Sequence, residues 1–263
     1  MNSVKRYVRI WWKLTMSSFM ISLLSRFNAV VFFAGKFLRF LFFLVFLLTV
    51  FTRTESLAGY TGSQMIFFYL SFNLIDTVTQ LLFREVYRFR PLIVSGDFDF
   101  ALVKPMSPLL RVLVGGADPL DLGMLPFYIS AVIYMAGRLG YVSGINIVFY
   151  VLLLVNGLII STGFHILVLA LGILATEVDH AIMIFRDVIN MGRIPTDLYH
   201  EPLRSVLTFV LPVGLMMTFP AKAFMGLLSP WMILFSFVLG LLFIVLCLKA
   251  WRFALSQYSS ASS

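Results

Sequence analysis

Cysteine and charge are what this sequence has least of. Cys247 is the only cysteine among 263 residues, so an intrachain disulfide and a cysteine-rich metal site are both excluded. Charged residues make up 12% of the chain, about half of their usual share in soluble domains. Hydrophobic residues make up 60%, and the mean hydropathy is +0.97. This balance excludes an ordinary soluble domain and indicates an integral membrane protein.

The motifs of several enzyme classes are missing as well. No GxxxxGK[ST] occurs and no GxGxxG opens a helix, so the chain cannot bind and hydrolyse ATP through the usual phosphate loop. HExxH, GxSxG and paired histidines on one helix face are also absent. We therefore predict no catalytic residues, no metal site and no cofactor. A membrane-embedded enzyme or scaffold stays an alternative without a supporting motif.

The net charge of +8 would suggest nucleic acid as a partner if the protein were soluble. In a membrane protein the same excess arises because Lys and Arg gather in cytoplasmic loops and contact anionic lipid head groups. We therefore expect membrane lipids as partners and no nucleic acid.

Long apolar runs decide the fold class. About 20 apolar residues cross the hydrocarbon layer, and this chain has room for about six such runs with short loops. The runs are too long and too uniformly apolar for barrel strands. We predict an all-α membrane protein, a six-helix transmembrane bundle in a single domain of residues 29–263. The expected spans are residues 29–51, 60–83, 112–137, 145–175, 177–196 and 229–251.

Residues 1–28 differ from the spans that follow. Five basic residues alternate there with an apolar stripe at helical spacing, and Trp11 and Trp12 are suited to the membrane interface. This pattern predicts an interfacial amphipathic helix with the N-terminus in the cytoplasm. No short apolar core with a cleavage site follows, so we expect no signal peptide. In the first span, Lys36 and Arg39 are expected to snorkel back to the cytoplasmic head groups.

Asp76 and His165 are polar, ionisable residues inside the second and fourth spans. Asp76 in the second span should face protein or water, because a carboxylate at span depth costs about 2.5–3.5 kcal/mol on insertion scales. An interhelical hydrogen bond is the simpler interpretation of Asp76, and a proton relay is the alternative. His165 is predicted to be a packed, hydrogen-bonded histidine in the fourth span.

The fifth crossing has two interpretations. Either residues 205–226 cross the membrane, or residues 177–196 cross it and residues 197–228 form a re-entrant, proline-broken element at the outer face. Pro212 and Pro220 interrupt the apolar stretch and favour the second interpretation. Lys and Arg after the last span place the C-terminus in the cytoplasm in either case.

Residues 84–111 form the most distinctive stretch outside the spans. Basic residues flank it on both sides, which places it in the cytoplasm. Gly96 to Asp99 predict a turn with a helix cap at Asp97 or Asp99, and an apolar repeat then runs until Pro105. This is the pattern of a short amphipathic helix beside the membrane. The third span that follows should start irregularly, because residues 115–119 read Gly-Gly-Ala-Asp-Pro.

These features favour transport driven by a separate motor. A transporter without an ATP-binding motif uses either an ion gradient or an ATPase partner. An ion-coupled carrier would concentrate its charges near the membrane midplane, whereas this chain has its most distinctive cluster outside the bilayer. An ion-coupled secondary transporter that uses Asp76 stays the alternative.

Two motifs in this order resemble the membrane-spanning permeases of ABC-2 type exporters, among them the daunorubicin-type multidrug exporters. The first reads Gly96-Asp97-Phe98-Asp99, then Leu102, Lys104-Pro105 and Ser107-Pro108. The second reads Arg193-Ile194-Pro195, then Tyr199, Leu203-Arg204, residues 206–212 and Phe219-Pro220-Ala221.

The resemblance implies roles for these residues and partners for the chain. It implies that a cytoplasmic coupling helix contacts an ABC ATPase subunit through Gly96, Asp97, Phe98, Asp99, Leu102, Lys104 and Pro105. An outer gate in a re-entrant element would be shaped by Arg193, Pro195, Pro212 and Pro220. It further implies a plasma (inner) membrane exporter, driven by ATPase subunits on separate chains. Its pore would form with a second copy or with a related permease.

Overall fold

The computed structural model describes residues 3–24, 26–140, 143–175 and 178–259 of the chain. These parts are helical apart from one small antiparallel hairpin, in which β1 (Ser56–Leu57) pairs with β2 (Tyr60–Thr61). The predicted all-α fold class is confirmed.

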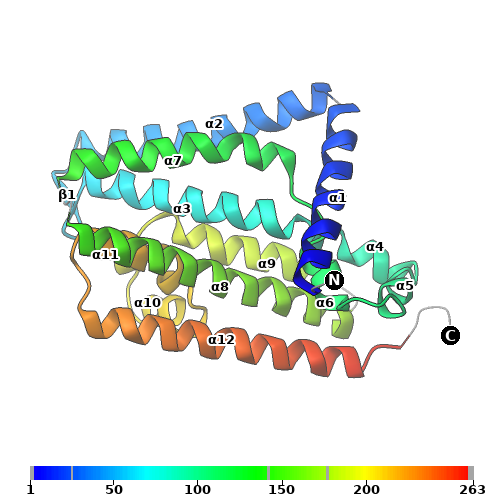
Figure 1. The fold of residues 1–263 in the computed structure, drawn as a ribbon. Helices are drawn as coiled ribbons and strands as arrows, with labels where there is room; N and C mark the ends of the chain where they lie inside the picture. The colour runs from blue at the N-terminus through cyan, green and yellow to red at the C-terminus, as the bar shows by residue number, and fades with distance from the viewer. Residues whose placement is uncertain (1–2, 25, 141–142, 176–177, 260–263) are drawn as a thin grey trace.

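Five long helices form the bundle in Figure 1. They are α2 (Arg26–Phe51), α3 (Gly62–Phe83), α7 (Pro119–Leu139), α8 (Gly144–Ala175) and α12 (Pro230–Ser256). Each is long and apolar enough to cross a membrane. Residues 203–210 and 214–224 pass the same test only as a bent pair, so the described ranges hold five spans, or six if that pair is one span.

The bundle has two different ends in Figure 1. The end with the β hairpin and the start of α12 is called the hairpin end here. The opposite end, called the terminal end, holds the last turns of α12 and the N-terminal helix α1 (Ser3–Leu24), which runs crosswise to the bundle. Four short helices lie there too: η1 (Arg84–Arg88), α4 (Phe89–Val94), α5 (Phe98–Leu102) and α6 (Pro108–Leu113).

The chain between α8 and α12 is built from short pieces. α9 (Val178–Asn190) is followed by η2 (Met191–Arg193), η3 (Thr196–Leu198), α10 (Leu203–Ser205), η4 (Val206–Val210), η5 (Gly214–Thr218) and α11 (Phe219–Phe224). The two halves of residues 203–224 meet at an angle of 77°, and we call this stretch the elbow. With 13 residues, α9 is about 20 Å long and does not cross about 30 Å of hydrocarbon alone.

Local sequence signals explain where the long helices begin and end. Thr61 and Gln64 form a reciprocal capping box at the start of α3. Asp118 caps α7 by accepting a hydrogen bond from the backbone of Leu120, and α7 ends at Gly140 in the left-handed conformation that glycine favours. The predicted third span therefore starts after a break, because residues 114–118 separate α6 from α7.

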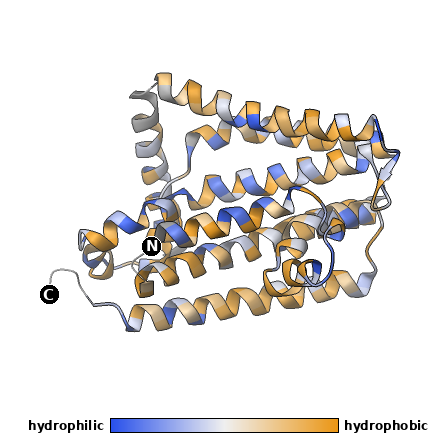
Figure 2. Cartoon of the chain, turned by 180° about the vertical axis from the view of Figure 1, so that it is seen from behind, coloured by the Kyte–Doolittle hydropathy of each residue, from blue (hydrophilic) through white to orange (hydrophobic). Residues whose placement is uncertain are grey.

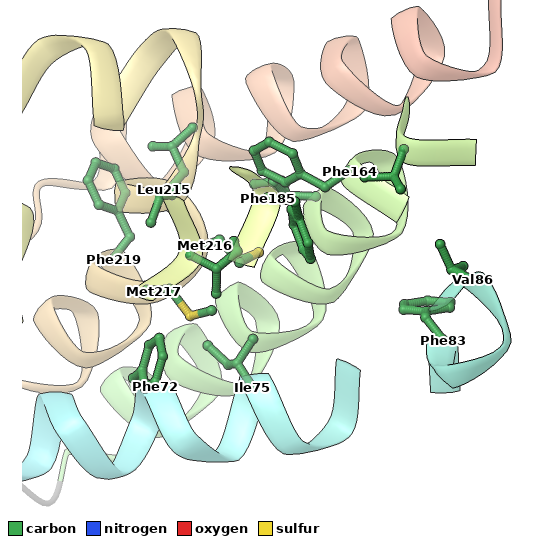
Figure 3. Close-up of a cluster of buried hydrophobic side chains, with 14 of the residues drawn as sticks. Phe72, Ile75, Phe83, Val86, Phe164, Phe185, Leu215, Met216, Met217 and Phe219 are labelled. Atoms are coloured by element: carbon green, nitrogen blue, oxygen red, sulfur yellow. The ribbon is translucent and has the colours of Figure 1, made fainter. Parts of the chain in front are cut away.

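The core lies between α3, α8, α9 and the elbow. In Figure 3, Met216 and Met217 of the elbow lie beside Phe72 and Ile75 of α3. The long helices differ in how much of their surface is buried. About two thirds of α3 and α8 is buried in their most apolar windows, against 11% for α2 and 22% for both α7 and α12. Figure 2 shows α12 hydrophobic along almost its whole length, as suits a helix that faces lipid or another subunit.

Candidate functional site

The predicted coupling segment is a folded unit at the terminal end, and α5 is its short helix. Gly96 precedes α5 with φ of +77°, a conformation that costs other residues energy. Asp97 is the N-cap residue of α5, one of the two predicted positions, but its side chain makes no capping hydrogen bond. The Asp97 carboxylate accepts a hydrogen bond of 2.7 Å from the Ser95 hydroxyl and bonds no backbone group of the helix.

The Phe98 side chain packs inside the protein and is not available on the surface for a partner. It is fully buried, and its ring lies 5.3 Å from that of Phe89, 5.2 Å from Tyr258 and 6.4 Å from Trp251, between ring centroids. Burial of the Tyr258 ring, and then the Asp99 carboxylate nearby, raise the pKa of the Tyr258 phenol. The segment is thus attached to the end of α12.

The exposed side of the segment is apolar in a way that the sequence did not indicate. Phe100 is 63% exposed, Val103 is 80% exposed and Val94 is 64% exposed. Lys104 and Pro105 are exposed too, whereas Leu102 is half-buried. Successive residues of a helix are about 100° apart, so the side chains of Phe98 and Phe100 differ by about 200° and point to nearly opposite sides. The two rings therefore cannot both face the core. We call Val94, Phe100 and Val103 the apolar tip.

One ion pair connects the segment to the start of α7, and another closes the segment on itself. Arg84 lies 3.3 Å from Asp118, which caps α7, and Glu85 pairs with Arg111 of α6 at 3.2 Å. A side chain at Gly115 would collide with Glu85, so the close approach requires glycine there. At the irregular start of the third span, the stretch around Gly115 therefore packs directly against η1.

Lys36 does not snorkel to the head groups as predicted. Its ammonium group forms an ion pair with Asp121, whose side chain is fully buried. A buried carboxylate needs such a partner, because an unpaired one would be neutralised or would destabilise the fold. Helix α1 closes the same region, since the backbone N–H of Ala117 donates to the Thr15 hydroxyl at 3.2 Å.

Three of the four predicted gate residues, Pro195, Pro212 and Pro220, are buried. Pro212 lies at the bend of the elbow, where a residue without a backbone N–H interrupts the helix. Arg193 points elsewhere, with its guanidinium 5.9 Å from the centre of the Phe43 ring on α2.

Asp197 binds three side chains at the hairpin end, a role that was not predicted from the sequence. Its carboxylate accepts hydrogen bonds from the Tyr60 hydroxyl at 2.6 Å, from Lys222 at 2.9 Å and from Arg204 at 2.7 Å. Burial by itself would raise the pKa of Asp197, but these three donors outweigh it and hold that pKa below its ordinary value. Tyr60 is 137 residues away in sequence, so no local pattern could have predicted the cluster.

Asp76 lines a small polar cavity in the interior. Its carboxylate accepts a hydrogen bond of 2.7 Å from Gln80 on the same helix, so the predicted interhelical bond is not the one observed. The cavity measures about 20 Å³, enough for about one water molecule, and its lining includes Arg39 and Arg186. Arg39 is exposed on α2 and also contributes to the lining of this cavity.

His165 is adjacent to this cavity and is packed as predicted. Its Nδ1 lies 2.8 Å from the carbonyl oxygen of Ser161, and the ring is almost fully buried against Phe83 and Phe185. Phe185 also lines the Asp76 cavity, so the two intramembrane polar residues share one neighbourhood.

The chain matches a known protein family over most of its length. Residues 36–262 match the family described as ABC-2 family transporter protein. The searches among curated proteins and among solved structures found no match. The match begins inside α2 and covers the rest of the bundle, including the coupling segment and the elbow.

Proposed function

Because the chain belongs to the ABC-2 family of transporter proteins, we propose that it is the permease subunit of an ATP-driven exporter. Its energy would come from ABC ATPase subunits on separate chains, and its translocation path would form with a second copy or a related permease. The chain itself would be non-catalytic. It is a multi-pass membrane protein, and we place both termini in the cytoplasm.

The observation that carries this proposal is the apolar tip at the terminal end. Exposed Phe100 and Val103 form an apolar surface on a short helix, flanked by the exposed charged residues Asp97 and Lys104. Clustered exposed apolar side chains with a polar rim are typical of protein contact sites. A motor subunit on the cytoplasmic side would find its docking site here.

The charge distribution supports this orientation. Basic residues are concentrated in α1, in the coupling segment and in the last turns of α12, all at the terminal end: Lys5, Arg6, Arg9, Lys13, Arg84, Arg88, Arg90, Lys104, Arg111, Lys249 and Arg252. Lys and Arg are retained on the cytoplasmic side of membrane proteins, so we assign the terminal end to the cytoplasm. The hairpin end would face outward.

The mechanism follows from how the segment is attached. It continues directly from α3, and Phe98 packs against Trp251 of α12. If the ATPase subunits move this segment when they close on ATP, α3 and α12 would therefore move together with it. For this coupling to work, the tip must contact the two motor states with energies that differ by a few kcal/mol.

The outward half of the mechanism would use the elbow. Its buried prolines and the Asp197 cluster hold it between α3 and α8 at the hairpin end in the present conformation. We expect a tilt of α3 to reach the elbow through Phe72 and Ile75, which lie beside Met216 and Met217 (Figure 3).

Co-purification of the tagged chain from its native membrane in mild detergent tests this proposal. We expect an ATPase subunit with a phosphate-binding loop to remain bound to the unchanged chain. Phe100→Glu together with Val103→Glu should remove it, because two carboxylates would replace the apolar tip. Leu227→Glu, at an exposed apolar position of the hairpin end, is the matched control and should retain the ATPase.

Either of two results would contradict the proposal. An ATPase that stays bound to the doubly substituted tip would disprove the docking site. A chain that reproducibly comes out alone would favour the ion-driven carrier, and Asp76 would then be the residue to replace.

A further inference from the structure

Three arginines, of which Arg39 and Arg186 are exposed and Arg193 is half-buried, line two adjoining spaces, and Arg39 lies at span depth. Arg39 lies 10 residues from the start of the apolar span Ala29–Phe51 and 12 from its end, hence roughly 15–18 Å from either edge. Arg39 and Arg186 line the small cavity at Asp76, and Arg39 and Arg193 line an open groove along α2. Arg39 belongs to both spaces and joins them.

These arginines lack sufficient negative charge around them. Within the described ranges none of the three forms an ion pair. Asp76 is the one carboxylate among the described residues that line the two spaces, so three guanidinium groups leave an excess of two positive charges. Asp187, next to Arg186 on α9, is exposed and lines neither space.

Positive charge at this depth needs a compensating group. A charged side chain near the bilayer centre is costly, and such residues usually line substrate or ion pathways. Lys36 on the same helix has a buried carboxylate as its partner, but Arg39, one turn further along α2, has none in the groove. The missing anion is therefore expected to come from outside the chain.

The groove has the size and the apolar surface of a ligand site. It measures about 530 Å³, within the range of small-molecule sites. Apart from its two arginines it is lined by Gly35, Leu38, Phe42, Phe43 and Phe46. Phe42 and Phe46 are largely exposed, and a guanidinium with aromatic rings beside it suits an acidic head joined to an apolar body.

We propose that this groove is a cargo subsite for amphipathic anions, molecules with one phosphate or carboxylate head and an apolar tail. Arg39 and Arg193 would bind the head, and Phe42 and Phe46 would pack against the tail. The assignment of the ligand as cargo rests on the proposed export function. The recognition chemistry does not, because it follows from the arginines and the aromatic rings alone.

Photolabelling of the purified chain in phosphatidylcholine nanodiscs tests the subsite. The probe is dodecyl phosphate with a photoreactive group in its chain, and the matched probe is dodecylphosphocholine with the same chain. We expect the phosphate probe to label residues 35–46 about tenfold more than the phosphocholine probe. Arg39→Gln and Arg193→Gln should abolish that preference, and Arg39→Lys should keep part of it. Arg138→Gln, an exposed arginine of α7 that contacts Tyr134, should leave it unchanged.

Two outcomes would overturn the inference. Equal labelling by both probes, or an undiminished preference in the Arg39 and Arg193 variants, would disprove recognition of the anion. Complete displacement of the probe by phosphatidylglycerol at ordinary membrane proportions would make the groove a resident lipid site and overturn its assignment to cargo. The experiment needs no ATPase, so its failure is distinct from a failure of the co-purification.

Discussion

Asp197 accepts hydrogen bonds from three side chains of three separate elements, and it joins the β hairpin to both halves of the elbow. At the scale of single residues, such partners decide whether a poorly solvated charge stabilises or destabilises the fold. Asp197 and Lys222 are each 16% exposed, so neither is well solvated and each depends on the other. The same reasoning separates Lys36, which is paired, from Arg39, which is not.

The lowered pKa of Asp197 predicts a loss of stability in acid. Its folded-state pKa lies below the unfolded value of about 3.9, so the stabilisation is complete above about pH 4 and is lost as the pH falls through the folded-state pKa. Asp197→Asn should lower the free energy of unfolding at neutral pH by about 1–3 kcal/mol. It should also remove this part of the pH dependence. Thermal unfolding in mild detergent at a series of pH values measures both effects.

Asp97→Asn is the matched control, because Asp97 is exposed and, within the described part of the chain, its carboxylate bonds only the hydroxyl of Ser95. We expect it to change stability by less than about 0.5 kcal/mol. Identical pH profiles for the two variants would contradict the role of Asp197.

At the scale of elements, glycine and small polar residues bring the central helices together. The Asn156 amide on α8 donates to the hydroxyl of Ser236 on α12 at 2.9 Å. Gly240, one turn further along α12, leaves room for the Asn156 side chain, and Gly163 makes a similar space for Phe243. Close contact through small residues is a common way for helices to associate in membranes.

Gly240→Ala should therefore weaken the contact between α8 and α12. Its methyl group would overlap the Asn156 amide and displace it from Ser236, at a cost of about 1–3 kcal/mol. Gly137→Ala on α7 is the control, because nothing lies within 4 Å of the added methyl group, and it should be neutral or slightly stabilising. Thermal unfolding in detergent compares the two variants. Equal melting temperatures would refute this account of the interface.

Prediction from sequence worked unevenly for the elements. Runs of apolar residues and strong breakers located α2, α3, α7, α8 and α12, because hydropathy and capping are properties of neighbouring residues. The short coupling helix was also predicted, but Phe98, expected to contact the ATPase subunit, is buried in the chain's own core, and the exposed Phe100 was not predicted. In a helix with apolar residues on both faces, only the packing partners decide which one is buried.

At the scale of the whole molecule, the open question is which segment forms the fifth crossing, because this decides the side of the membrane on which residues 197–228 lie. Asp197 is bonded to Tyr60 at the hairpin end, whereas α9 follows α8, whose last residues lie toward the terminal end (Figure 1). This geometry supports the proposal that residues 177–196 cross the membrane and that residues 197–228 are re-entrant at the outer face. Residues 176 and 177 lie outside the described ranges.

Cysteine labelling tests this topology. Cys247 is the only cysteine of the chain and is buried, so Cys247→Ala provides a background without reactive thiols. We expect Glu201→Cys to react with a membrane-impermeant maleimide on intact cells, as the Thr54→Cys control in the turn before the hairpin should. Gln257→Cys should react only after permeabilisation. If Glu201→Cys is protected like Gln257→Cys, residues 205–226 are the crossing instead.

The sequence by itself determined that the protein is a multi-pass helical membrane protein with a separate segment between its second and third spans. Those conclusions depend on hydropathy, charge bias and helix breakers, which act over a few residues. The tertiary structure decided which charges are paired. Lys36 and Asp121 are 85 residues apart, and Tyr60 and Asp197 are 137 apart. Only the folded bundle brings them together, and only the bundle leaves Arg39 and Arg193 facing a groove without a carboxylate, because burial and pairing are properties of the whole packing arrangement.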